Sequence, residues 1–156
     1  MRSFVIAAFA CLALAAFGCG KEEDSTPVAC LEGAGAYERA LAAAPGEVLL
    51  GGETPISDCL VSGQTGGDLS RVGEAMVETA TGLNAEAQAD PGGEASVQLG
   101  YLLGAAQRGA GGSEGIHADL VRRLTVAARY APGDQPLPPE FVRAYRTGYA
   151  AARTDG

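Results

Sequence analysis

The chain has 156 residues, of which 47% are apolar and 19% are charged, and its formal net charge is −8. This length is typical of one domain, and this balance of residues excludes a wholly disordered chain, a collagen-like chain and a polytopic membrane protein. The acidity argues against nucleic acid as a partner, because proteins that bind nucleic acid displace counterions from its phosphates with a basic face.

The N-terminus has the pattern of a secretory signal peptide. Arg2 is followed by fourteen consecutive apolar residues, Phe4 to Phe17, then by small residues and a polar run that begins at Lys21. A charged start, an apolar stretch and small residues at the exit are typical of such signals. As a helix, fourteen residues would rise about 21 Å, against roughly 30 Å for the hydrocarbon core of a bilayer. A retained transmembrane anchor is therefore the less favoured alternative.

The sequence Ala16-Phe17-Gly18-Cys19 resembles the lipobox of bacterial lipoproteins, with Ala16 where a leucine is usual. The resemblance implies cleavage before Cys19 and acylation, for example with palmitate, of the Cys19 thiol and its new amine. It thus implies an extracytoplasmic protein of the cell envelope, with membrane lipid as its partner through Cys19. Ala16 and Gly18 also suit the ordinary secretory peptidase, so plain secretion stays open.

We predict three segments: a signal peptide over 1–18, a lipid-anchored tether over 19–29 and a single helical domain over 30–154. After cleavage and acylation, Cys30 and Cys59 are the two remaining cysteines. In an oxidising compartment two such thiols are expected to form a disulfide. The absence of a C-x-x-C motif makes a redox or metal pair the weaker alternative.

Helical spacing of apolar residues recurs along the predicted domain. In chain order, we expect helical segments over 30–44, 54–63, 68–89, 94–108, 116–128 and 139–153. The second is very short, and residues 48–50 before it form either a buried loop or a stub of strand. This pattern predicts an all-α fold, a small bundle of about five short helices.

The segment 94–108 is apolar around much of its circumference, so we expect it to be the central and most buried helix. Gly100 and Gly104 lie four residues apart in it. In a membrane this spacing is typical of helix dimers. In a water-soluble domain it predicts a neighbouring helix packed closely against bare backbone.

Few residues carry chemistry. His117 is the only histidine, and a lone histidine near a helix start is expected to lie on the surface. No Walker loop, H-E-x-x-H, G-x-S-x-G, EF-hand loop or C-x-x-C-H motif is present. We therefore expect no catalytic residue, no metal site, no cofactor and no enzymatic activity.

Charge is unevenly distributed along the chain. Residues 19–98 contain 14 acidic and 3 basic side chains, and residues 99–156 contain 5 acidic and 7 basic ones. Either the two halves complement each other, or the arginines form a face for an anionic polymer, lipid headgroup or partner. The aromatic row Phe141, Tyr145 and Tyr149 either docks the last helix or stacks a ligand. The candidate interaction residues are Tyr145, Tyr149, Arg122, Arg129, Arg143 and Arg146.

These patterns together predict a non-enzymatic, lipid-anchored binding module at the membrane surface. Its partner in the envelope is not specified by any motif. The alternative is an envelope enzyme or small-ligand carrier with a site between helices. Such a site would lie where His117 meets carboxylates, or at the rings of Tyr145 and Tyr149.

Overall fold

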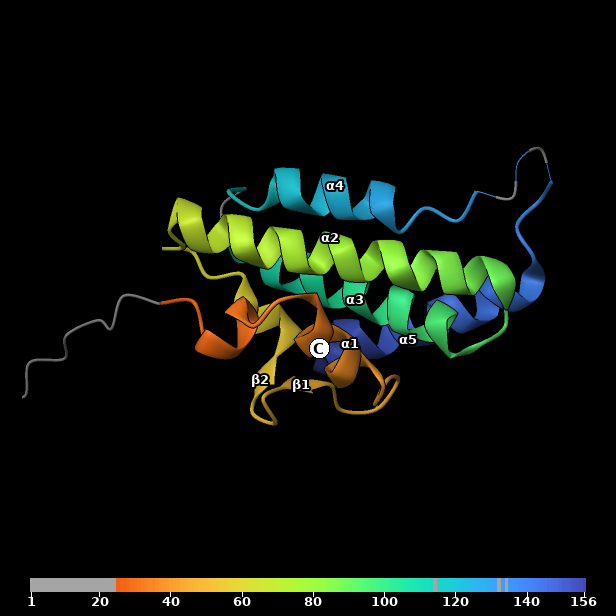
Figure 1. Cartoon of the computed structure of the whole chain (residues 1–156), viewed down its shortest axis with the longest axis horizontal. Coiled ribbons are helices and arrows are strands. Elements are labelled where there is room, and N and C mark those ends of the chain that lie inside the picture. Colours follow the sequence, from red (N-terminus) through yellow and green to blue (C-terminus); the bar gives the residue numbers. More distant parts are fainter. Residues whose placement is uncertain (1–24, 114, 132, 134) are drawn as a thin grey trace, which may run out of the picture.

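The computed structural model describes residues 25–113, 115–131, 133 and 135–156. The signal peptide predicted over 1–18 and the lipidation site Cys19 lie outside this range and stay predictions. Within it, five α-helices form one small bundle, with a two-stranded stub at one side (Figure 1). The all-α fold predicted from the spacing of apolar residues is confirmed.

The elements follow one another along the chain with short connections. In order they are η1 (Val28–Leu31), α1 (Ala34–Leu41), β1 (Leu49–Leu50), β2 (Thr54–Pro55), η2 (Ile56–Cys59), α2 (Gly66–Ala89), α3 (Glu94–Ala110), α4 (Ala118–Ala127) and α5 (Pro139–Asp155). Both η elements are short 3-10 helices. The strand stub expected near residues 48–50 is β1, which pairs antiparallel with β2 through a turn at Gly51 and Gly52.

Two of the expected helices are shorter than predicted. The segment 30–44 divides into η1 and α1, because Gly33 between them has a φ of 85°, outside the right-handed helical region. The segment after Thr54 contains only the single turn η2. Thr54 and Pro55 are taken up by strand pairing, and Leu60 leaves helical geometry with φ −112° and ψ 75°.

The folded structure begins before Cys30, where the predicted tether was expected to end. Thr26 is buried, and its hydroxyl oxygen accepts a hydrogen bond of 3.0 Å from Gln64 Nε2. Gln64 lies directly before α2, whose first turn is capped by the Thr65 hydroxyl. The last residues of the predicted tether are therefore packed against the start of α2.

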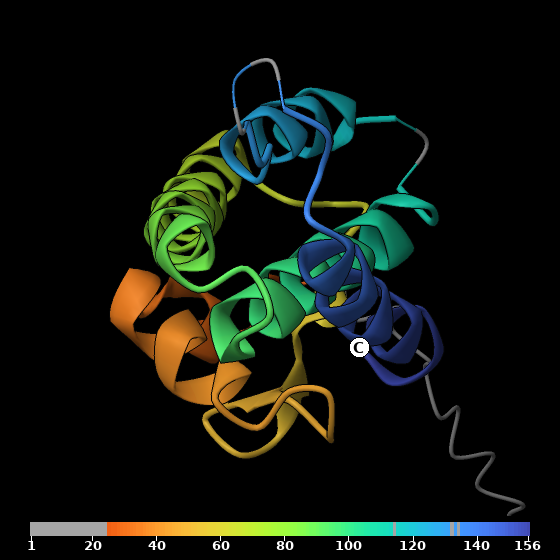
Figure 2. The same ribbon diagram turned by 90° about the vertical axis from the view of Figure 1, so that its right-hand side faces the viewer.

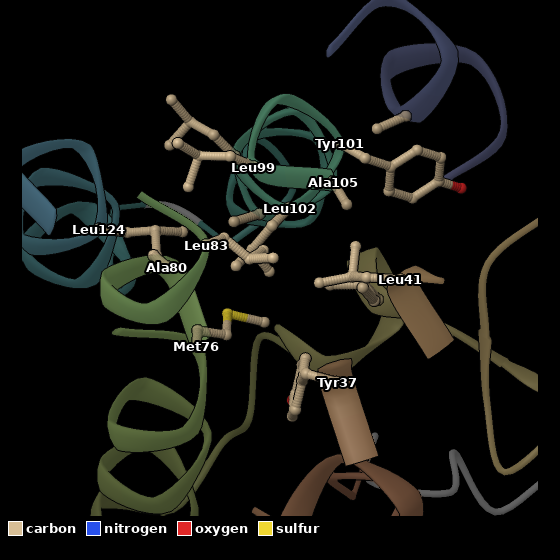
Figure 3. Packing of buried hydrophobic residues seen from close by; sticks show 14 of the residues in the cluster. Tyr37, Leu41, Met76, Ala80, Leu83, Leu99, Tyr101, Leu102, Ala105 and Leu124 are labelled. Carbon is tan, nitrogen blue, oxygen red and sulfur yellow. The ribbon is translucent and has the colours of Figure 1, made fainter. Parts of the chain in front are cut away.

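Helix α3 occupies the middle of the bundle, with α1, α2, α4 and α5 around it (Figure 2). Its Leu102 points toward Met76 and Leu83 of α2 and toward Leu41 of α1 (Figure 3). The prediction that this helix is the central one is confirmed. Alanine fills many of the other inward positions: Ala36, Ala75, Ala80, Ala87, Ala105, Ala106, Ala128 and Ala152 are all buried.

Helices α3 and α5 meet over bare backbone, as Gly100 and Gly104 predicted. A Cβ placed on Gly100 would lie 2.0 Å from the carbonyl oxygen of Tyr145, and one on Gly104 would lie 2.7 Å from that of Tyr149. From the other side, a Cβ on Gly148 would lie 1.8 Å from the carbonyl oxygen of Val97. These three glycines form what we call the glycine seam, and any side chain there would separate the helices.

The predicted pair Cys30 and Cys59 is at disulfide distance. The two sulfurs are 2.00 Å apart and both side chains are fully buried, so the bond joins η1 to η2 inside the core. In the chain-entropy estimate a closed loop of this length stabilises the fold by roughly 3.5 kcal/mol. The Tyr37 hydroxyl donates a 3.1 Å hydrogen bond to the Cys30 carbonyl, which holds α1 against the same turn.

The glycine seam generates the first prediction. Gly148→Ala and Gly100→Ala should each lower the free energy of unfolding by about 3 kcal/mol, because the clashing atoms belong to backbone and cannot rotate away. Gly82→Ala is the matched control. Gly82 is exposed within α2 with no atom within 4 Å of an added Cβ, so this change should stabilise the protein by about 1 kcal/mol. Urea unfolding measures all three; equal effects at the seam and at Gly82 would contradict the close packing.

Candidate functional site

A pocket of about 630 Å³ lies between the end of α4, the connector that follows it and the first turns of α5. Its walls are mostly apolar and aromatic, and we call it the arginine–tyrosine pocket. The residues that line it are Ala128, Arg129, Tyr130, Ala131, Gly133, Gln135, Leu137, Phe141, Val142, Tyr145 and Arg146. Two of the predicted interaction arginines and one of the two predicted tyrosines are thus brought to one concave site.

The aromatic wall of the pocket comes from a four-residue spacing on α5. Pro139 begins this helix, and Phe141 and Tyr145 follow on one face, with ring centroids 5.6 Å apart. Tyr130 of the connector packs on Phe141 with ring centroids 4.3 Å apart. Burial, with a smaller effect of Tyr149, raises the pKa of Tyr145 to about 12. Its hydroxyl is therefore neutral at physiological pH and is available as a hydrogen-bond donor.

The aromatic row docks the last helix, which was one of the two roles considered from the sequence, while its role in stacking a ligand stays a prediction. Phe141 is 5% exposed and belongs to the core, and Tyr149 donates a hydrogen bond from its hydroxyl to Gln107 of α3. These two rings dock α5 onto the bundle. Tyr145, between them, contributes to the pocket as well.

The candidate arginines do not form one face. Arg129 and Arg146 line the pocket, whereas Arg122 and Arg143 do not. Arg122 pairs with Asp119 one turn away on α4, in an ion pair whose side chains are 73% and 64% exposed. This is the only ion pair within 4.0 Å among the described side chains. The acidic and basic halves are thus not joined by ion pairs in that part of the chain.

Asn84 holds the α4 side of the pocket in place. Its Nδ2 donates hydrogen bonds of 3.1 Å to the carbonyl oxygens of Ala127 and Arg129, so the end of α4 is fixed to α2 near the C-terminal end of that helix. Sequence reasoning missed this residue. The available signal was an asparagine within a long helical pattern, a position that its low helix propensity disfavours.

The expectation that His117 lies on the surface is wrong. Its side chain is 0% exposed, and its Nε2 lies 2.7 Å from Gln64 Oε1. Gln64 in turn donates from Nε2 to the Thr26 hydroxyl and, at 2.9 Å, to the Cys59 carbonyl. The segment before α4 folds back over the bundle to reach these groups, which spacing within one helix does not reveal.

The hydrogen bonds of Gln64 fix the state of His117. Because the Gln64 amide nitrogen is already a donor, its Oε1 accepts, and His117 Nε2 carries the proton of a neutral imidazole. His117 Nδ1 is buried and has no partner among the described residues. Burial lowers the pKa of His117, because it disfavours the charged ring. A proton added at Nδ1 would also have no acceptor among the described residues. Among the described residues no carboxylate forms a hydrogen bond with His117. The contact between His117 and carboxylates that the alternative hypothesis required is therefore not found in that part of the chain.

A second pocket, of about 660 Å³, lies beside the first described residues and is lined by Ser25 and Pro27. It is polar, and Asp58 and Arg108 place opposite charges in its lining. Arg108 also donates to the carbonyl oxygen of Thr154. Among its described lining residues, the acidic and the basic side chain therefore offset each other.

The described residues contain no group of three or more His, Cys, Asp or Glu side chains arranged to hold a metal ion. Of the helices in the same part of the chain, none has both the length and the apolarity needed to span a bilayer. No protein-family model, no curated protein and no solved structure matches this chain.

The buried imidazole predicts a pH dependence of stability. Below its ordinary pKa of 6.5, the unfolded chain takes up a proton at His117 that the folded chain resists. Stability is therefore complete above pH 6.5 and is lost as the pH falls toward the lower folded pKa, by up to about 1.4 kcal/mol per pH unit. Urea unfolding between pH 7.5 and 4.5 should show this loss in the wild type and not in His117→Gln.

Nuclear magnetic resonance provides the direct check, because an untagged chain has a single histidine. The imidazole Cε1 proton should titrate with a midpoint below 6.5 in the folded protein. A midpoint at or above this value, or parallel stability curves for the wild type and His117→Gln, would contradict the burial of a neutral ring.

Proposed function

We propose that this protein is a lipid-anchored, extracytoplasmic binding module without catalytic activity, and that it holds a small ligand in the arginine–tyrosine pocket. The address is supported by the signal pattern and by the lipobox-like sequence that ends at Cys19. A cysteine pair at bonding distance in the core is consistent with an oxidising compartment.

The observation that carries the proposal is the pocket itself. Its volume of about 630 Å³ lies within the range typical of small-molecule sites, which are concave and mostly apolar with a few convergent polar groups. Here the apolar part includes Tyr130 and Phe141, and the polar groups are the two arginines and the Tyr145 hydroxyl. No histidine, cysteine, aspartate or glutamate is among the lining residues that the structure describes, which favours binding over acid–base or nucleophilic chemistry.

A small ligand fits these groups better than a broad macromolecular surface does. Only two of the four candidate arginines line the pocket, and Arg122 is paired with Asp119 instead. Few polar groups thus converge, and they lie in a concave site rather than over a broad surface. This favours the small-ligand carrier that was the alternative from the sequence.

Filling the pocket tests the proposed function. We expect residues 19–156 with Cys19→Ser, produced in an oxidising compartment, to bind the neutral fluorophore N-phenyl-1-naphthylamine. Ala131→Phe should abolish most of this binding, because Ala131 is exposed and lines the pocket, so a ring there takes up its volume. Fluorescence titration measures the affinity, and circular dichroism reports whether the fold is kept.

Ala85→Phe is the matched control, since Ala85 is exposed on α2 and does not line the pocket. It should bind the probe as the parent chain does. Absence of binding by the parent chain, or equal loss in both variants, would refute a ligand site at this position.

Mass spectrometry of the mature protein tests the proposed address. The full-length chain expressed in a bacterium should start at Cys19 and carry acyl mass on that residue, and Cys19→Ala should carry none. The same sample should show Cys30 and Cys59 joined. An unprocessed N-terminus, or an unmodified Cys19 at the start of a secreted chain, would contradict lipid anchoring. Neither result would bear on the proposed ligand site in the pocket.

A further inference from the structure

The two charged side chains among the described lining residues of the arginine–tyrosine pocket are both cationic. Arg129 and Arg146 are both exposed and line it, and its described lining contains no acidic residue. Neither guanidinium makes an ion pair or a side-chain hydrogen bond with any described residue. Two cations that line one pocket repel each other, and an anion between them would relieve this repulsion.

The rest of the lining suits an apolar body of limited size. Tyr130 and Phe141 lie with ring planes inclined by 34° and form an aromatic surface, and Leu137, 48% exposed, extends it. Guanidinium groups beside aromatic rings recognise planar acids well, because the head pairs with arginine while the body packs on the rings.

We propose that the ligand of this pocket is a small amphiphilic organic anion, with an aromatic or alkyl body and one carboxylate or sulfonate head held by Arg129 and Arg146. This inference rests on the proposed function and specifies its ligand class. The body packs against Tyr130, Phe141 and Leu137, and the Tyr145 hydroxyl, which stays protonated, donates to the head.

The position of the pocket favours a ligand from solution over a lipid of the membrane to which the protein would be anchored. Thr26 is bound at Gln64, before the first turn of α2, and the Arg129 carbonyl is bound at Asn84. Asn84 lies twenty residues after Gln64, nearly all of them helical, so these points are about 30 Å apart. In Figure 1 the first described residues and the connector after α4 accordingly lie at opposite ends of the molecule.

The stretch between Cys19 and Thr26 is too short to offset that separation. The six residues 20–25 reach roughly 20 Å even when fully extended. When the domain stands upright on the bilayer, its pocket therefore lies away from the headgroups of the anchoring leaflet and is open to soluble anions.

Two matched probes separate this inference from the proposed function. N-phenyl-1-naphthylamine and 8-anilinonaphthalene-1-sulfonate share one ring skeleton and differ by the sulfonate. The non-acylated chain should bind the sulfonate at least tenfold more tightly. In Arg129→Gln/Arg146→Gln this preference should disappear, because binding of the sulfonate should weaken roughly tenfold more than binding of the neutral probe does.

Arg143→Gln/Arg153→Gln is the control. It removes the same total charge as the first double variant, but both of its residues lie on α5 outside the pocket lining. It should keep the preference for the sulfonate. If neither probe binds, the proposed function fails. If both bind equally, or if both double variants lose the preference together, the pocket stands as a binding site and the anionic ligand class is refuted.

Vesicles test the source of the anion. The non-acylated chain should stay in the supernatant when phosphatidylglycerol vesicles are sedimented, as it should with phosphatidylcholine vesicles. Sedimentation with phosphatidylglycerol that Arg129→Gln/Arg146→Gln abolishes and Arg143→Gln/Arg153→Gln preserves would overturn the soluble ligand and assign the pocket to an acidic lipid.

Discussion

The contact of α3 with α5 over bare backbone determines where the candidate site lies. Helix α5 carries Phe141, Tyr145 and Arg146, and it packs chiefly on α3 through the glycine seam. The opposite wall of the pocket, at Arg129 and Tyr130, is held separately, because Asn84 of α2 binds the backbone there. The pocket thus lies between two walls, and different helices position them. Its width is determined by how closely α5 approaches α3, a distance that only residues without a side chain allow.

Two half-buried amides, Gln64 and Asn84, help to hold this alanine-rich bundle together. Many inward positions of this bundle are alanines, which bury little area each. Gln64 and Asn84 compensate at the two ends of α2 by binding backbone and side-chain groups of distant segments. Such buried polar contacts specify one arrangement, since a group that loses its partner stays desolvated. Gln64 joins Thr26, the carbonyl of the disulfide-paired Cys59 and the only histidine of the chain into one cluster.

Features that depend on local spacing were predictable from the sequence. The 3.6-residue period gave the helices, the four-residue spacing of Gly100 and Gly104 gave the close approach, and cysteine parity gave the Cys30–Cys59 pair. The burial of His117 was not predictable, since its partner Gln64 is 53 residues away and both stand outside regular helices. For the same reason, the sequence does not show which arginines line the same pocket. This depends on how α5 is rotated onto α3 and on where the connector after α4 returns.

The proposed anchor and the proposed pocket lie at opposite ends of α2. Attachment of the domain and access of the ligand therefore depend on different parts of the structure. The tether end needs firm attachment, and there the chain is held by the disulfide and by the buried cluster of Gln64, Thr26 and His117. The pocket end needs access, and there the arginines are exposed and the connector is rich in proline. Most of the 24-residue helix α2 lies between the two and keeps them about 30 Å apart. A ligand that binds at the far end does not have to disturb the packing that holds the domain to its anchor.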